Sequence, residues 1–132
     1  MRGDIETPWA GRAKEYAWSL MERYAPRKIT PSDIDYIVEC RGHFVAFEMK
    51  TGSADLSYGQ RLMLERLLNG WTMRSRVVVI RHAPLDRVVI PEHVETFETW
   101  RWSEDGVLRG GPYSGADFAE WYGEWFKKAD RP

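Results

Sequence analysis

The sequence has one cysteine in 132 residues and lacks any long hydrophobic run. A single thiol, Cys40, allows no internal disulfide, and such cysteine usage is typical of a reducing compartment. The longest uncharged apolar stretches, such as residues 77–80, are far shorter than the roughly 20 residues that cross a bilayer. No apolar segment follows the first residues, so we expect no signal peptide and a cytoplasmic protein that has no membrane partner.

The chain also lacks a strong net charge, because 19 Lys and Arg side chains face 20 Asp and Glu side chains. This balance excludes a protein that is basic throughout, so any nucleic-acid binding must come from a local surface. Residues 51–90 hold six basic and three acidic side chains, whereas residues 91–132 hold five and nine. The middle third is therefore where we expect a surface that faces phosphate groups.

The hydrophobic patterns predict one α/β domain that spans residues 1–132. Helical spacing of apolar residues predicts helices at 8–24, 56–68 and 116–128. Runs rich in β-forming residues predict strands at 33–40, 44–50 and 76–81, and weaker ones at 87–90 and 96–102. A short turn joins the first two strands in a hairpin, and the second helix makes a crossover to a third strand parallel to the second. The result is a mixed sheet flanked by helices.

Four polar residues interrupt the first two predicted strands: Asp33, Asp35, Glu48 and Lys50. Strand alternation places Glu48 and Lys50 on one face, and the hairpin brings Asp35 beside them. Two carboxylates this close repel each other unless a cation lies between them, and hard oxygen ligands suit Mg²⁺ or Mn²⁺. The alternative interpretation is a salt pair of Glu48 and Lys50 on an edge strand that faces water.

The spacing of these residues resembles a known signature. Asp35, twelve intervening residues and then Glu48-Met49-Lys50 resemble the motif of the PD-(D/E)xK nuclease superfamily. The resemblance implies a restriction-endonuclease-like α-β-β-α-β core over about residues 9–81, with residues 82–132 as an extension that holds a strand and an aromatic helix. The flanking segments agree, because residues 11–15 resemble the upstream acidic helix and residues 56–60 the Ser-x-x-Gln helix start of archaeal-type Holliday-junction resolvases and VRR-NUC proteins.

The resemblance also implies roles for individual residues. The metal would be bound by two carboxylates and a main-chain carbonyl, those of Asp35, Glu48 and Met49. Lys50 would serve the nucleophilic water, Glu15 would complete the acidic cluster, and Gln60 would support the site. The implied contacts with nucleic acid are Lys50, Ser57, Tyr58 and Arg61.

The sequence departs from the family pattern at the first acidic position. Pro31 is followed by Ser32 and Asp33, so the proline is not adjacent to Asp35. Asp33 is therefore an alternative metal ligand. We prefer Asp35, because its spacing to Glu48 fits a short hairpin whose two ends meet.

These observations predict a Mg²⁺- or Mn²⁺-dependent DNA endonuclease that hydrolyses phosphodiester bonds. A chain this small favours recognition of a DNA structure, such as a branch or junction, and an origin in a phage or mobile element is an analogy. A homodimer is expected, and the aromatic residues of the last helix could form its seam or pack on the sheet. The alternative is a catalytically inactive nuclease fold that binds DNA or a protein.

Overall fold

The computed structural model describes residues 19–25, 34–83 and 93–132, and the chain divides into two compact units, residues 1–33 and 34–132. In the first unit, residues 19–24 are helical, which confirms this part of the helix predicted at 8–24. The predicted ligands Glu15 and Asp33 and the predicted strand at 87–90 lie outside the described residues.

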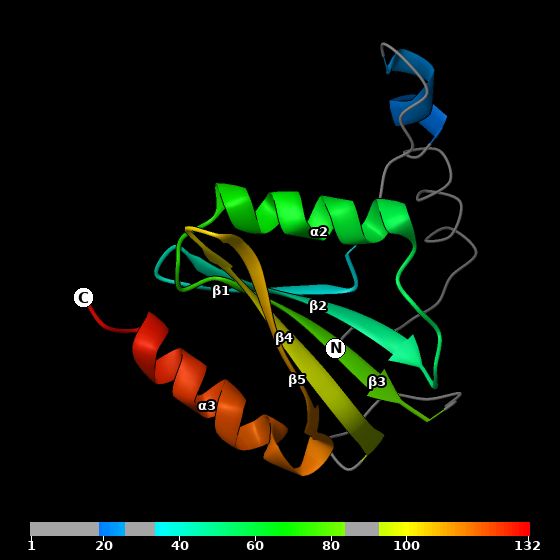
Figure 1. Cartoon of the computed structure of the whole chain (residues 1–132). Coiled ribbons are helices and arrows are strands. Elements are labelled where there is room, and N and C mark those ends of the chain that lie inside the picture. Colours follow the sequence, from blue (N-terminus) through cyan, green and yellow to red (C-terminus); the bar gives the residue numbers. More distant parts are fainter. Residues whose placement is uncertain (1–18, 26–33, 84–92) are drawn as a thin grey trace, which may run out of the picture. The chain divides into compact units, whose positions relative to one another are not determined.

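The second unit contains a five-stranded mixed sheet whose spatial order follows the sequence (Figure 1). Strand β2 pairs in parallel with β3, and the other three neighbouring pairs are antiparallel. The elements are β1 (Tyr36–Cys40), β2 (His43–Thr51), α2 (Tyr58–Gly70), β3 (Arg76–His82), β4 (Val94–Ser103), β5 (Gly106–Ser114), the 3-10 turn η2 (Gly115–Asp117) and α3 (Phe118–Ala129). The predicted α/β class and the parallel crossover through α2 are thus confirmed.

A two-residue turn fixes the register of the β1–β2 hairpin. Cys40 pairs with His43, and the loop residues Arg41 and Gly42 have φ angles of 51° and 86°. Positive φ at both positions is the geometry of a type I′ turn, whose twist matches that of the flanking strands. The register continues to Tyr36, which lies opposite Phe47. The start of β1 therefore lies beside the middle of β2, and the second half of β2 continues past the end of the β1 pairing.

Strand β5 is absent from the sequence prediction, and β4 is longer than the segment predicted at 96–102. Glycine and proline are depleted in strands, and β5 contains Gly110, Gly111 and Pro112. Gly111 is needed here, because it has a φ of 101° beside an irregularity in the β4–β5 register and a Cβ would meet the Phe97 carbonyl. A Cβ on Gly110 would meet the Tyr113 hydroxyl, the end of an exposed side chain. Residues 82–132, predicted as an extension, supply two strands of the sheet itself.

Helices cover both faces of the sheet (Figure 1). Along β2, Val45 and Phe47 face α3, whereas Ala46 faces α2, as strand alternation requires. The core on the α2 face consists of Ala46, Leu64, Leu68, Val77, Val79 and Trp100. The core on the α3 face consists of Val45, Phe47, Val78, Ile80, Phe97, Trp125 and Ala129.

The aromatic side chains of α3 pack against the sheet, which was one of the two interpretations of this helix. Trp121, Tyr122 and Phe126 border the core on this face, and the Trp125 indole N–H donates a hydrogen bond of 2.8 Å to the Arg74 carbonyl. The homodimer stays a prediction. Within the described ranges, no helix is long and apolar enough to cross a membrane.

Two glycines near α3 should respond in opposite ways to alanine. Gly115 is buried, and a Cβ there would overlap the main-chain carbonyl of Val94, whereas Gly123 lies within α3 with open space around it. We expect Gly115→Ala to lower the free energy of unfolding by about 3 kcal/mol, because backbone must move. Gly123→Ala should raise it by about 0.5–1 kcal/mol, because alanine restricts the unfolded chain and favours helix. Urea denaturation of both variants measures this, and equal stabilities would contradict the packing of η2 beneath β4.

Candidate active site

Two of the predicted acidic residues, Asp35 and Glu48, lie together toward the end of strand β2. Just before β1 begins, the Asp35 carboxylate accepts a hydrogen bond of 2.8 Å from the main-chain N–H of Met49. Since Tyr36 is paired with Phe47, the hairpin register carries Asp35 to the level of Glu48. This bond holds the Asp35 carboxylate against β2 at the point where β1 pairing stops. The structure thus brings Asp35 to the position that the sequence predicts.

Glu48 is a buried acidic residue in the middle of the sheet. Its side chain is 3% exposed, and β2 lies between β1 and β3, so the interpretation as an edge-strand pair facing water is wrong. Its Oε1 atom has no hydrogen-bond partner within the described part of the chain. The pKa of Glu48 is raised to about 7. Burial is the largest cause, repulsion from Asp35 adds to it, and the Lys50 ammonium opposes both effects. A cation bound beside Glu48 would stabilise the ionised form of this buried carboxyl, whose Oε1 atom has no partner among the described residues.

Lys50 is tied to the start of α2 through Gln60. The Lys50 ammonium donates to Gln60 Oε1 at 3.3 Å, and the same oxygen accepts the Ser57 N–H at 3.2 Å. In return, the Gln60 N–H donates to the Ser57 hydroxyl at 3.1 Å, which completes a capping box. The side chain that caps the helix therefore also positions Lys50. The sequence predicted a supporting role for Gln60, and this double contact is its structural basis.

The predicted carbonyl ligand, Met49, faces the same edge as its N–H. In a strand, the N–H and C=O of one residue point to the same side, so the Met49 carbonyl lies on the side of Asp35. The structure gathers Asp35, Glu48, Lys50 and Gln60 around the end of β2. Among the described residues, no group of three or more His, Cys, Asp or Glu side chains could hold a metal ion.

The first turn of α2 presents the predicted nucleic-acid contacts. Ser57 is the N-cap, and Tyr58 is 71% exposed. The Arg61 guanidinium lies 5.8 Å from the centre of the Tyr58 ring, a cation–π contact at the surface. These side chains follow directly from the capping box that holds Lys50. The predicted contact residues and the candidate catalytic residues therefore belong to one continuous region.

Sequence reasoning missed a cavity of about 360 Å³ beside this region, which we call the arginine cavity. Its lining consists of Asp55, Leu56, Arg61, Val79, Arg81, Glu98, Trp100 and Arg109. The sequence could have indicated that Arg81 lies near the site, because the predicted parallel strand after β2 places it opposite Lys50. The sequence could not have placed Arg109 there, because its position depends on strand β5, which the sequence does not predict.

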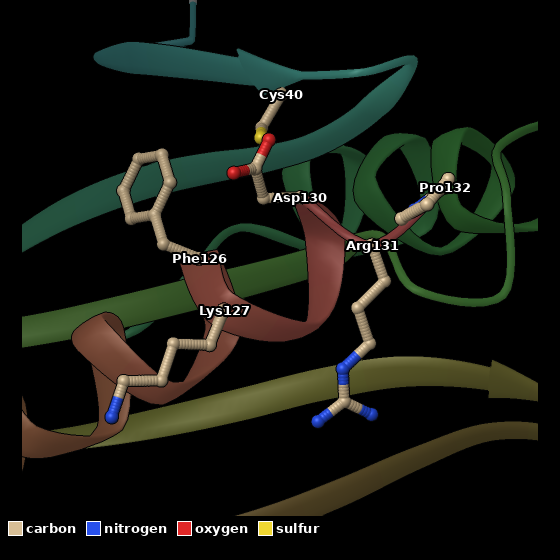
Figure 2. Close-up of a pocket in the computed structure, with 6 residues that line it drawn as sticks. All are labelled: Cys40, Phe126, Lys127, Asp130, Arg131 and Pro132. Carbon is tan, nitrogen blue, oxygen red and sulfur yellow. The ribbon is translucent and has the colours of Figure 1, made fainter.

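A second hollow lies on the other side of the molecule, at the end of α3 (Figure 2). Its lining is Cys40, Phe126, Lys127, Asp130, Arg131 and Pro132. Cys40 is a half-buried free thiol, and the Arg41–Asp130 ion pair beside it spans 4.0 Å between exposed side chains. Such an exposed pair is weak, and the hollow contains none of the predicted site residues.

Comparison with known proteins gave no match to a protein-family model, to a curated protein or to a solved structure. The PD-(D/E)xK resemblance therefore depends on the residues themselves. Its support is local: an Asp and a Glu-x-Lys at the adjoining ends of two hairpin strands, followed by a capped helix.

The raised pKa of Glu48 should make the stability of the metal-free protein depend on pH. Between the ordinary pKa of 4.5 and about 7, folded Glu48 holds a proton that the unfolded chain has lost. Stability is therefore greatest at low pH within this window and falls as pH rises through about 7. Lowering the pH from about 8 to about 5.5 should add about 2 kcal/mol from this group.

Urea denaturation in the presence of chelator, at several pH values, measures this dependence. Glu48→Gln should lack this increment and should be more stable than wild type at about pH 8. Identical pH profiles for the two proteins would mean that Glu48 is not buried as described.

Proposed function

We propose that this protein is a metal-dependent endodeoxyribonuclease that hydrolyses phosphodiester bonds, with a catalytic centre of the PD-(D/E)xK type. The observation that carries the proposal is the set of Asp35, Glu48 and Lys50 toward one end of β2, with a buried Glu48 oxygen that has no hydrogen-bond partner among the described residues. A reducing cytoplasm is the compartment we propose for it, consistent with its single cysteine.

The donor atoms of the site suit a small divalent cation. Asp35 and Glu48 offer carboxylate oxygens and Met49 a carbonyl oxygen, and Mg²⁺ and Mn²⁺ prefer such hard ligands. The family resemblance adds Glu15, or Asp33 in place of Asp35, as an acidic ligand. When bound, the cation would act as a Lewis acid toward a phosphoryl oxygen. Binding of the cation by the Glu48 Oε1 atom, which has no partner among the described residues, would offset the free-energy cost of burying that atom away from water.

Lys50 supplies the positive charge that the chemistry needs next to the carboxylates. Its ammonium donates its hydrogen bond to Gln60, a neutral partner, so the charge is held in place close to the Glu48 carboxyl. An ammonium held this way would orient the attacking water and stabilise charge that develops on the phosphate. Gln60 is a positioning residue, because it acts through Lys50 and through the helix cap.

The proposed substrate is branched or junction DNA. Within the unit of residues 34–132, the described sheet and its two helices are one compact body with no added domain for reading a long base sequence. Exposed Tyr58 and Arg61 next to Lys50 suit contact with the backbone and with an unpaired base. A homodimer would give two cuts on a symmetric junction and is part of the proposal.

Cleavage of a DNA panel tests the proposal directly. The panel contains linear, nicked, single-stranded, flapped and four-way-junction DNA, with Mg²⁺, Mn²⁺ or chelator. We expect cleavage that requires metal, and a loss of at least about 100-fold in Glu48→Gln and Lys50→Ala, because each removes a charge from the reacting centre. The matched controls are Glu120→Gln and Lys127→Ala, which change exposed residues of α3. Cleavage that survives in Glu48→Gln would refute the assignment.

Metal binding can be measured without cleavage. Mg²⁺ or Mn²⁺ well above its dissociation constant should raise the free energy of unfolding of wild type by about 1–3 kcal/mol. Glu48→Gln should gain much less, whereas Glu120→Gln should match wild type. An equal response of all three proteins, with no cleavage, would favour the alternative of an inactive nuclease fold that binds DNA or a protein. The absence of a three-residue ligand group among the described residues is the observation that keeps this alternative in the test.

A further inference from the structure

The arginine cavity is lined by arginines that belong to three separate elements. Arg61 comes from α2, Arg81 from β3 and Arg109 from β5, and all three line the same space of about 360 Å³. The lining also contains the carboxylates of Asp55 and Glu98, so cationic groups outnumber anionic ones. Guanidinium groups that converge from different elements form the usual protein environment for phosphate.

The existing partners of Arg61 and Arg81 leave these two side chains able to bind an anion, whereas Arg109 is already paired with Glu65 at 3.0 Å. The Arg81–Asp55 pair spans 3.4 Å, but the Asp55 side chain is 90% exposed, so the pair is weak. Arg61 contacts only the Tyr58 ring at the surface and makes no ion pair within the described residues. Arg81 also donates to the carbonyl oxygens of Gly52 and Ala54, which fixes its guanidinium at the rim.

Trp100, which lines the cavity, carries a buried donor for which the described residues supply no acceptor. Trp100 is 1% exposed, and its indole N–H has no hydrogen-bond partner among the described residues. The Arg109 guanidinium lies 4.0 Å above the centre of the Trp100 ring and is bound to Glu65 at 3.0 Å. Buried donors are rarely left unsatisfied in proteins, so this one indicates an acceptor that arrives with a ligand.

The strand register makes the cavity continuous with the candidate active site. Lys50 faces Arg81 across the β2–β3 pair, and Val79 lies between Glu48 and Glu98 on neighbouring strands. All of these positions share the α2 face of the sheet. Glu48 and Glu98 are two strand spacings apart, or about 10 Å. A nucleic-acid strand that reaches Glu48 would therefore place a nearby phosphate at the arginine cavity.

We infer that the arginine cavity binds a phosphate group of a nucleic-acid strand and holds that strand in register with Glu48 and Lys50. The inference rests on the proposed nuclease function for the class of its ligand. The phosphate is either the 5′-terminal group of the strand or an internal phosphodiester, and both offer the oxygens that guanidinium groups and an indole N–H can bind.

Fluorescence anisotropy in chelator tests binding without cleavage. The probes are two single-stranded DNA oligonucleotides of one sequence, labelled at the 3′ end, one with a 5′-phosphate and one with a 5′-hydroxyl. Arg61→Gln removes one guanidinium of the cavity, and its exposed position predicts an intact fold. Arg66→Gln is the matched control, because Arg66 is also an exposed arginine of α2 but does not line the cavity.

We expect Arg61→Gln to weaken binding about tenfold and to lower the slope of log affinity against log salt by about 1, while Arg66→Gln stays close to wild type. A loss confined to the 5′-phosphorylated probe assigns the cavity to a terminal phosphate. An equal loss for both probes assigns it to an internal phosphodiester. Equal effects of Arg61→Gln and Arg66→Gln on both probes would overturn the inference, because binding would then reflect general surface charge.

The two proposals fail in different experiments. Selective weakening in Arg61→Gln without any metal-dependent cleavage would support the phosphate site and refute the nuclease. Cleavage that needs Glu48, together with equal binding by Arg61→Gln and Arg66→Gln, would support the nuclease and refute the phosphate site.

Discussion

Strand β2 is the constraint on which the rest of this structure depends. It pairs with β1 on one side and with β3 on the other, and helices cover both of its faces. Its alternation sends Val45 and Phe47 toward α3, and it sends Ala46, Glu48 and Lys50 toward α2. A shift of one residue in register would bury the ammonium among the aromatic side chains of α3. The same pairing that builds the core therefore also orients the candidate site.

One residue of the candidate site, Glu48, lowers the stability of the sheet. Burying Glu48 removes its carboxyl from water, and the resulting pKa of about 7 measures the cost of ionising it there. An alanine or valine at this position would continue the apolar surface formed by Ala46 and Val79. Local departures of this kind are concentrated at functional sites in proteins. The Oε1 atom, which has no hydrogen-bond partner in the described part of the chain, is consistent with that interpretation, since the oxygens of a structural carboxyl in a core are normally hydrogen-bonded.

The sequence predicts the hairpin, the parallel crossover and the common face of Glu48 and Lys50, because these depend on local alternation and on a short turn. It also predicts the start of α2, because Ser57 and Gln60 form a capping box three residues apart. It does not predict β5 or the arginine cavity. Gly110, Gly111 and Pro112 disfavour a strand locally, and only pairing with β4 overrides that preference. Arg109 meets Arg61 and Arg81 through this distant pairing, which no local pattern encodes.

The charges on the α2 face are sorted into two rows that run across the strands. Glu48 and Glu98 occupy one row on either side of Val79, and the adjacent row contains Lys50 and Arg81 in direct register. Like charges directly opposite each other on neighbouring strands are destabilising, so Lys50 and Arg81 favour a ligand of negative charge. Glu48 and Glu98 are one strand further apart, and the buried Glu48 carboxylate favours a cation. Among the described residues, Lys50 has neutral Gln60 as its hydrogen-bond partner and the Glu48 carboxyl nearby, and Arg81 binds main-chain carbonyls and an exposed carboxylate.

A nucleic acid with its divalent counterion carries charges of both signs, and it can satisfy both rows at once. A cation would lie along the acidic row near Asp35, and the phosphates would lie along the basic row that leads into the arginine cavity. A protein partner would need acidic and basic side chains in the same spacing to do this. A phosphodiester strand with bound metal provides that pattern through its own chemistry, because phosphate oxygens recur along the strand and bind divalent cations directly. The charge arrangement of this face thus favours a nuclease substrate over a protein surface.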